Sequence, residues 1–115
     1  EPGLPSVSFA ADIQPILTTS CAKTNCHSGG NPDASLDLRQ GAAYGELVDM
    51  ASTQCFGDRT RVTPGDPEES YLFDKIRNKD LCGNSKRMPY PPTAMLTPEQ
   101  RTLFEAWICA GALEN

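Results

Sequence analysis

Hydrophobic residues early in the chain recur at the spacing of a helix that would span residues 9–20. The apolar positions are Phe9, Ile13, Ile16 and Leu17. Pro15 lies inside this run, where a mid-helix proline removes a hydrogen bond and clashes with the preceding turn. Ser8 could cap a helix that kinks at Pro15, or Asp12 could cap a later helix with Pro15 in its first turn. We favour the Asp12 start, because the first turn of a helix tolerates proline.

Two later segments carry stronger helix-start signals. The sequence DPEE at 66–69 offers a capping aspartate, a proline at the first helical position and a glutamate three residues after the cap. The sequence TPEQ at 97–100 repeats this pattern, and Gly111 is suited to ending the helix that follows. The buried stripes expected on the two helices are Leu72, Phe73 and Ile76 on the first, and Leu103, Phe104, Trp107 and Ile108 on the second.

The rest of the chain predicts one short helix and long connections. A helix over 39–49 is weakened by Gly41 and Gly45. Turn-forming residues predict loops over 28–37, 51–65 and 80–96, and no strand pattern emerges. We therefore predict an all-α fold of about four short helices and long loops. Residues 1–8 are expected to be a flexible arm or linker, and residues 9–115 a single domain.

Composition narrows the functional classes. A chain of 115 residues with 38% hydrophobic and 7% aromatic residues has a modest core. A net charge of −5 disfavours nucleic-acid binding, which needs clustered basic residues. No apolar run could cross a bilayer and no signal peptide is recognisable. The start at Glu1 suggests a trimmed product, which leaves room for a lipid or fusion tether.

Five cysteines in a chain of this length indicate an oxidising compartment or a metal. The most informative group is Cys21, Cys26 and His27, the last being the only histidine. Two thiols beside an imidazole are the groups needed for covalent haem attachment, although the usual spacing is C-x-x-C-H. Residues five apart on an unbroken helix point about 140° apart. For Cys21 and Cys26 to reach one porphyrin, the four residues between them must therefore leave the helix.

Other chemistry fits the same residues. Cys21 and Cys26 could be disulfide partners in a helical binding module. A structural zinc ion could instead take Cys21, Cys26 and His27 as three ligands, with the fourth from Cys55, Cys82 or Cys109. Zinc ligands usually come as two tight pairs, whereas the remaining cysteines here are scattered.

A haem would need a further ligand in a stiff segment, and Met88 fits that requirement. It precedes Pro89, in a stretch where prolines restrict the backbone. A thioether opposite a histidine raises the reduction potential and leaves the iron without an open site. Met95 is the main competitor and Met50 a weaker one, and any methionine can simply fill a core.

Four blocks of the chain carry a family resemblance. The chain resembles a class I-type c-type cytochrome domain over about residues 9–113. The blocks that carry the resemblance are FAADIQPILTTSCAKTNCH, VTPGDPEESYLFDKI, CGNSKRMP and LTPEQRTLFEAWICAGA. The variety with four-residue spacers, found in planctomycete-type and related bacterial cytochromes, is the most similar. The resemblance implies one haem c bound through Cys21 and Cys26, with His27 and Met88 on the iron. It also implies that the terminal helices cross, with Phe9 and Ile13 meeting Leu103, Phe104 and Trp107.

The function implied is outer-sphere electron transfer by a monohaem, monomeric, periplasmic or otherwise extracytoplasmic protein with redox partner proteins. No enzyme is expected, because the sole histidine would be used by the iron and no general base remains. The alternatives are a haem peroxidase or gas-binding sensor with an exchangeable sixth ligand, and a zinc- or disulfide-stabilised binding module.

The remaining cysteines and several donors receive secondary roles. A Cys55–Cys82 disulfide would join two loops, while Cys109 is expected to remain a buried thiol of the last helix; pairing of Cys109 with Cys55 or Cys82 is the alternative. Haem propionates could be neutralised by Arg59, Arg61 and Arg87, which otherwise would face solvent. Trp107 is expected in the core, with its indole N–H available to a propionate.

Overall fold

Helices form the regular structure of the residues that the computed structural model describes, which are 5–21, 36–52, 59–82, 86–89 and 94–115. In chain order they are η1 (Phe9–Ile13), α1 (Gln14–Ser20), α2 (Ala43–Leu47), η4 (Pro67–Glu69), α3 (Tyr71–Arg77) and α4 (Pro98–Cys109). Isolated β-bridges join Val48 to Val62, Ala51 to Thr60 and Thr60 to Ser70, but these ranges hold no longer strand. The predicted all-α class is confirmed.

Ser8 caps the first helix, so the favoured start at Asp12 is wrong. The Ser8 hydroxyl accepts a hydrogen bond from the Ala11 amide, and the Ser8 amide donates to the Asp12 carboxylate. Residues Phe9–Ile13 form one wide π-helical turn, and Pro15 then occupies the first turn of α1. The π-helical turn allows Ser8 to cap the helix while Pro15 still lies in a first turn. This is possible because the hydrogen bonds change from the π pattern to the α pattern before Pro15.

The middle helix is shorter than the predicted 39–49. Gly41 has a φ of +93°, a left-handed conformation, and α2 starts only at Ala43. Val48 then adopts an extended conformation that ends the helix. The backbone amide of its neighbour Asp49 donates to the Val62 carbonyl at 2.9 Å. Pairing with a segment more than ten residues away therefore cuts the helix short.

The helix predicted from Asp66 is divided in two. Asp66 caps η4 as expected, since its side chain accepts from the Glu69 amide, but Ser70 is extended. The buried Ser70 hydroxyl accepts from the Thr63 amide and donates to the Asp66 carbonyl. The Tyr71 amide, the first of α3, donates to the Thr60 carbonyl at 2.9 Å. The 60–63 segment thus satisfies polar groups that a continuous helix would have used internally.

The last helix agrees with its prediction at both ends. Thr97 and Gln100 form a reciprocal capping box, with Pro98 in the first turn of α4. Gly111 has a φ of +108°, which only glycine adopts readily, and its amide donates to the Ile108 carbonyl. Local sequence signals are sufficient to define this helix.

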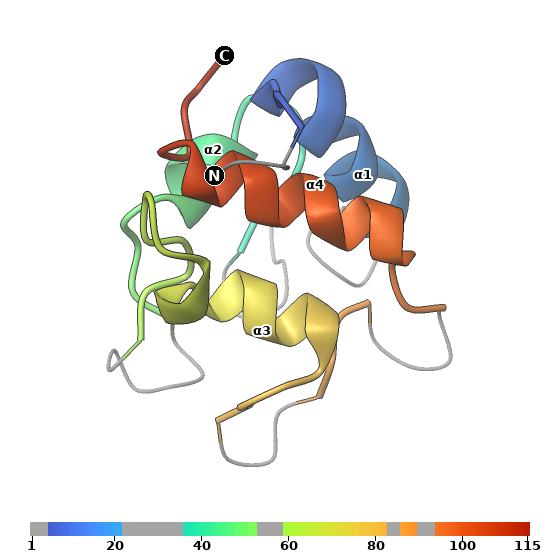
Figure 1. Cartoon of the computed structure of the whole chain (residues 1–115), viewed down its shortest axis with the longest axis vertical. Coiled ribbons are helices and arrows are strands. Elements are labelled where there is room, and N and C mark those ends of the chain that lie inside the picture. Colours follow the sequence, from blue (N-terminus) through green and yellow to red (C-terminus); the bar gives the residue numbers. More distant parts are fainter. Residues whose placement is uncertain (1–4, 22–35, 53–58, 83–85, 90–93) are drawn as a thin grey trace.

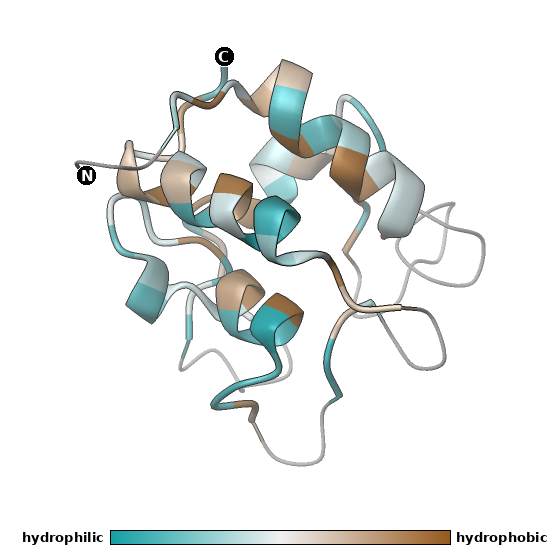
Figure 2. Ribbon diagram, turned by 45° about the vertical axis from the view of Figure 1, so that its right-hand side comes forward, coloured by the Kyte–Doolittle hydropathy of each residue, from teal (hydrophilic) through white to brown (hydrophobic). Residues whose placement is uncertain are grey.

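Helix α4 lies between η1 and α1 on one side and α3 on the other (Figure 1). The Phe9 ring lies 5.1 Å from the Trp107 ring, centroid to centroid, and 5.4 Å from that of Tyr44. Ile13, Phe104 and Trp107 belong to the same buried cluster, with Leu103 packed against it. The predicted packing of the terminal helices is confirmed. Figure 2 shows that these helices carry both hydrophobic and hydrophilic residues, as an amphipathic packing predicts.

The two ends of the described chain meet beside η1. Asn115 accepts hydrogen bonds from the Phe9 amide through Oδ1 and from the Ser8 hydroxyl and Ala10 amide through its carbonyl. These contacts satisfy amides of the first helical turn that have no partner within the helix. Val7, in the predicted arm, packs against the hydrophobic cluster.

Candidate functional site

Cys21 lies at the carboxyl end of α1 and belongs to the core. Its amide donates to the Leu17 carbonyl at 2.9 Å, and the residue is 7% exposed. Cys26 and His27 lie outside the described residues, so their approach to Cys21 stays a prediction. Cys21 does end the first helix, as predicted.

Met88 is half-buried and is held against the end of α3. Its amide donates to the Lys75 carbonyl at 2.8 Å. That carbonyl is one of the last four of the helix, and these carbonyls have no N–H partner within the helix. The following Pro89 is buried, and the peptide bond joining it to Met88 is cis. The methionine backbone is therefore fixed by a helix end.

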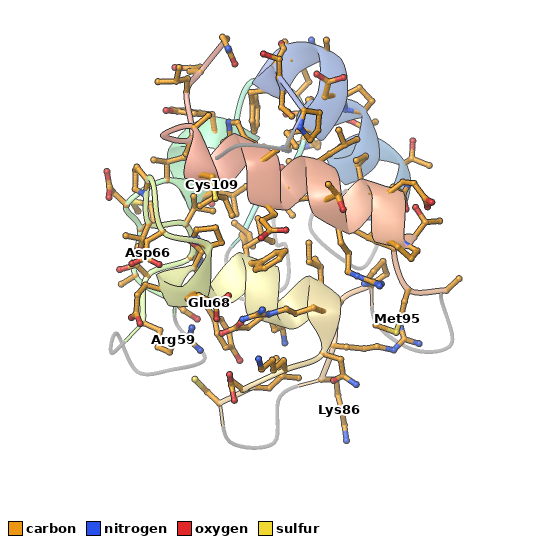
Figure 3. The ribbon with its side chains drawn as sticks, viewed as in Figure 1. Arg59, Asp66, Glu68, Lys86, Met95 and Cys109 are labelled. Carbon is orange, nitrogen blue, oxygen red and sulfur yellow. The ribbon has the colours of Figure 1, made fainter. Side chains whose placement is uncertain are left out.

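Two further hydrogen bonds attach the same segment to α3. The Cys82 amide donates to the Tyr71 hydroxyl at 3.0 Å, and the Lys75 ammonium donates to the Lys86 carbonyl. Tyr71 and Lys75 are four residues apart, which places them on one face of the helix. In Figure 3 the Lys86 side chain points away from the body of the molecule. The group of Lys86 that Lys75 binds is the backbone carbonyl.

Lys75 is an unusual member of this face because it is 6% exposed. Burial lowers its pKa to about 8, since removal of water disfavours the charged form. The ammonium lies 5.9 Å from the centre of the Tyr71 ring, and the Arg59 guanidinium lies 4.9 Å from the same ring. The aromatic face gives these cations a favourable partner in place of water.

The competing methionines are more exposed than Met88. Met95 is 39% exposed and Met50 is 44% exposed. Met95 lies at the edge of the molecule, just before α4 begins (Figure 3). Met88 is half-buried. The choice of Met88 over the two competitors stays a prediction.

The predicted propionate partners already have protein contacts. Arg59 is paired with Asp74 at 2.6 Å, and the buried Arg61 donates to the Glu46 carbonyl at 2.9 Å. Burial lowers the pKa of Arg61. Arg87 donates to the Pro89 carbonyl at 2.9 Å. Each guanidinium has further N–H groups, so a propionate role for the three stays a prediction.

Trp107 has one donor, and that donor is used inside the protein. Its indole N–H donates to the Leu113 carbonyl at 2.9 Å, while the ring is 1% exposed. The expectation of a core position is confirmed, and the propionate contact is wrong. The physical reason is that the chain folds back after Gly111, bringing a backbone acceptor to the indole edge.

The other cysteines separate into two environments. Cys82 is disulfide-bonded, which removes it from the candidate zinc ligands. Its pairing with Cys55 stays a prediction, because Cys55 lies outside the described residues.

Cys109 is in the last turn of α4 but is half-buried, so the expected full burial is wrong. It lines a pocket of about 330 Å³ whose other walls are Pro5, Ser6, Val7, Ala106, Ala110, Leu113 and Asn115. The small alanine side chains around it leave this space.

Tyr71 and Lys75 are site residues that the sequence pattern did not single out. Their signal was a lysine placed between Leu72 and Ile76 in an apolar stripe, four residues after a tyrosine. Within the described ranges no group of three or more histidine, cysteine, aspartate or glutamate side chains could hold a metal ion. Over the same part of the chain, no helix has the length and apolar character needed to span a bilayer.

Comparison with known proteins gives one informative likeness. No protein-family model matches the chain, and no curated protein matches it. Among solved structures, the chain is similar to part of hydrazine synthase from Kuenenia stuttgartiensis, with a TM-score of 0.58 and 26% identical residues. The similarity covers 93% of this chain but 16% of the hydrazine synthase chain. The chain is thus similar in fold to a small region of a larger protein.

Proposed function

We propose that this chain is a monohaem c-type cytochrome domain that transfers electrons without catalysing a reaction of its own. The observation that carries the proposal is the placement of Met88, half-buried and hydrogen-bonded to the end of α3. The likeness to a region of hydrazine synthase supports the same reading at the level of the fold.

The donor set present fits a covalently bound haem c. A buried thiol at a helix end, Cys21, and a half-buried thioether, Met88, are the soft sulfur groups that such a cofactor uses. Cys26 would provide the second thioether bond, and His27 the nitrogen ligand. The disulfide bond of Cys82 removes it from the candidate fourth ligands of the alternative zinc site, for which Cys55 and Cys109 remain.

Haem c, when bound, supplies reversible one-electron chemistry at its iron. The residues of the chain hold and shield that group. Cys21 and Cys26 would fix its position, while His27 and Met88 would leave the iron without an open site. The hydrogen bonds from α3 limit movement of the Met88 segment, which keeps the structural change between oxidation states small. The net charge of −5 favours redox partners with a basic surface.

A second candidate role follows from the size of the similar structure. Because the chain corresponds to 16% of the hydrazine synthase chain, a domain of this kind also fits inside a larger polypeptide. There it would pass electrons to or from a neighbouring catalytic unit. Immunoblotting of the native source with an antibody against this chain separates the two roles by the size of the protein detected.

The test is expression in a host that attaches haem, followed by intact-mass and absorption measurements. We expect a mass increase equal to one haem, and in the oxidised protein a band near the red edge of the visible spectrum that marks methionine–iron coordination. Met88→Ala should remove that band while the haem stays attached. Met95→Ala is the matched control and should leave the spectrum unchanged.

The outcomes separate the alternatives. Loss of the haem in Cys21→Ala and Cys26→Ala variants, with retention in Cys109→Ala, supports the attachment assignment. A haem protein that lacks the methionine band and binds carbon monoxide readily when reduced would favour a sensor or peroxidase. A colourless product holding stoichiometric zinc would favour the binding module.

A further inference from the structure

A buried lysine holds the segment that carries Met88 at two points. The Lys75 carbonyl accepts from the Met88 amide at 2.8 Å, and the Lys75 ammonium donates to the Lys86 carbonyl. One residue of α3 thus binds the backbone on both sides of Arg87. Of these two contacts, only the ammonium bond depends on the identity of the side chain.

The position of this lysine is costly for stability. Lys75 is 6% exposed and lies in a helix face that also contributes Leu72 and Ile76 to the core. Burying an ammonium requires loss of its water, whereas an apolar side chain of similar volume would be stabilised by the same burial. Core packing therefore does not explain the choice of lysine. A role that needs a hydrogen-bond donor at the Lys86 carbonyl does.

We infer that Lys75 is a positioning residue for Met88, whose ammonium holds the 86–88 segment so that the thioether stays on the haem iron. The inference rests on the proposed function. Without the ammonium, the Met88 amide would keep its bond to α3, but the segment before it would be released. The thioether would then leave the iron more often, and an added ligand could take its place.

The test compares Lys75→Leu with wild type in the haem-loaded protein at one fixed pH. Leucine has nearly the volume of lysine but no donor. Imidazole is the probe, because it binds the oxidised iron only when Met88 has left. A hydrogen bond from a charged group is worth enough to change such an equilibrium by about 10-fold or more. We expect imidazole to bind Lys75→Leu about 10-fold more tightly, and the methionine band to weaken.

Lys79→Leu is the matched control, since Lys79 is exposed and its replacement removes the same charge. It should leave both the band and the imidazole affinity at wild-type values. Urea unfolding of the haem-loaded variants supplies a readout of structural damage. Positioning predicts that Lys75→Leu is as stable as wild type or more stable. If Lys75→Leu does not fold, Lys75→Gln takes its place, because the glutamine side chain is one bond shorter and carries no charge.

Each result has a defined meaning. An unchanged band and affinity in the Lys75 variant would overturn the inference. So would marked destabilisation with the band intact, because the lysine would then serve stability alone. Absence of the methionine band in wild type would instead refute the proposed ligand, which distinguishes failure of the proposed function from failure of this inference.

Discussion

The Arg59 guanidinium donates a hydrogen bond of 2.6 Å to the Asp74 carboxylate, in an ion pair whose acid is 1% exposed. Arg77 pairs with the other oxygen of the same carboxylate, also at 2.6 Å. Asp74 precedes Lys75 in α3, so two adjacent charged residues attach different segments to this helix: residue 59 through Asp74, and residues 86–88 through Lys75. Helix α3 is therefore the element that organises the candidate site.

Replacement of Asp74 should strongly destabilise the protein. Asp74→Asn keeps the shape of the side chain but removes the anion that pairs with Arg59, and it leaves Arg77 with only the exposed Glu68. We expect the free energy of unfolding to fall by about 2–4 kcal/mol, less than for fully buried pairs because both guanidinium groups reach water. Urea denaturation measures this. Glu68→Gln removes a pairing carboxylate that is 68% exposed, and should cost less than about 1 kcal/mol. Equal effects of the two substitutions would contradict the larger contribution of the buried Asp74 carboxylate to stability.

The capping box of α4 predicts a pair of substitutions with different effects. Thr97→Ala removes the acceptor of the Gln100 amide and should lower the free energy of unfolding by about 1 kcal/mol. Thr102→Ala, inside the same helix, should cost much less, because alanine is the better helix former. Thermal or urea unfolding of both variants makes the comparison. A larger loss for Thr102→Ala would argue against the observed helix start.

Trp107→Phe should destabilise the crossing of the terminal helices. The substitution removes the donor to the Leu113 carbonyl and part of the contact with the Phe9 ring. We expect a loss of about 1–3 kcal/mol in the free energy of unfolding. Leu113→Ala is the control, since its side chain is 54% exposed and its carbonyl is retained; it should change stability by less than about 0.5 kcal/mol.

Asp37 should titrate well below an ordinary aspartate. Its hydrogen bonds with Arg39 lower the pKa of the carboxyl group from 3.8 to about 2. Because the unfolded chain takes up the proton first, the contribution of this pair to stability is complete above pH 3.8 and is lost as the pH falls through about 2. Carbon NMR of the Asp37 carboxyl group measures the pKa directly. In Arg39→Gln the value should return towards 3.8, and an unchanged value would refute the cause.

The accuracy of the helix predictions depended on where each helix end finds its partners. The start of α4 was predicted correctly because Thr97 and Gln100 satisfy each other within one turn. The break before α3 was missed because Ser70 bonds to the Thr63 amide, and no local pattern reveals that contact. The Ser8 start was ranked second because Asn115, which supports the same turn, is 107 residues away from it.

The candidate site was predictable at the level of residue types. Spacing indicates Cys21 and proline context indicates Met88; the first is buried and the second half-buried. Lys75 was not chosen, because a lysine in an apolar stripe has meaning only when the group it reaches is known. The Lys86 carbonyl lies eleven residues away in an irregular segment, and only the folded chain brings the two together.

The sequence by itself determined the all-α class, the ends of the last helix and the sulfur and imidazole groups available for a cofactor. Helical periodicity and capping are local properties, which act over three or four residues. The tertiary structure decided which loop each charged residue holds, that the Met88 backbone is bound to a helix end, and where the middle helices stop. Those features depend on hydrogen bonds and burial between segments far apart in the chain, and their energy exists only after the segments have met.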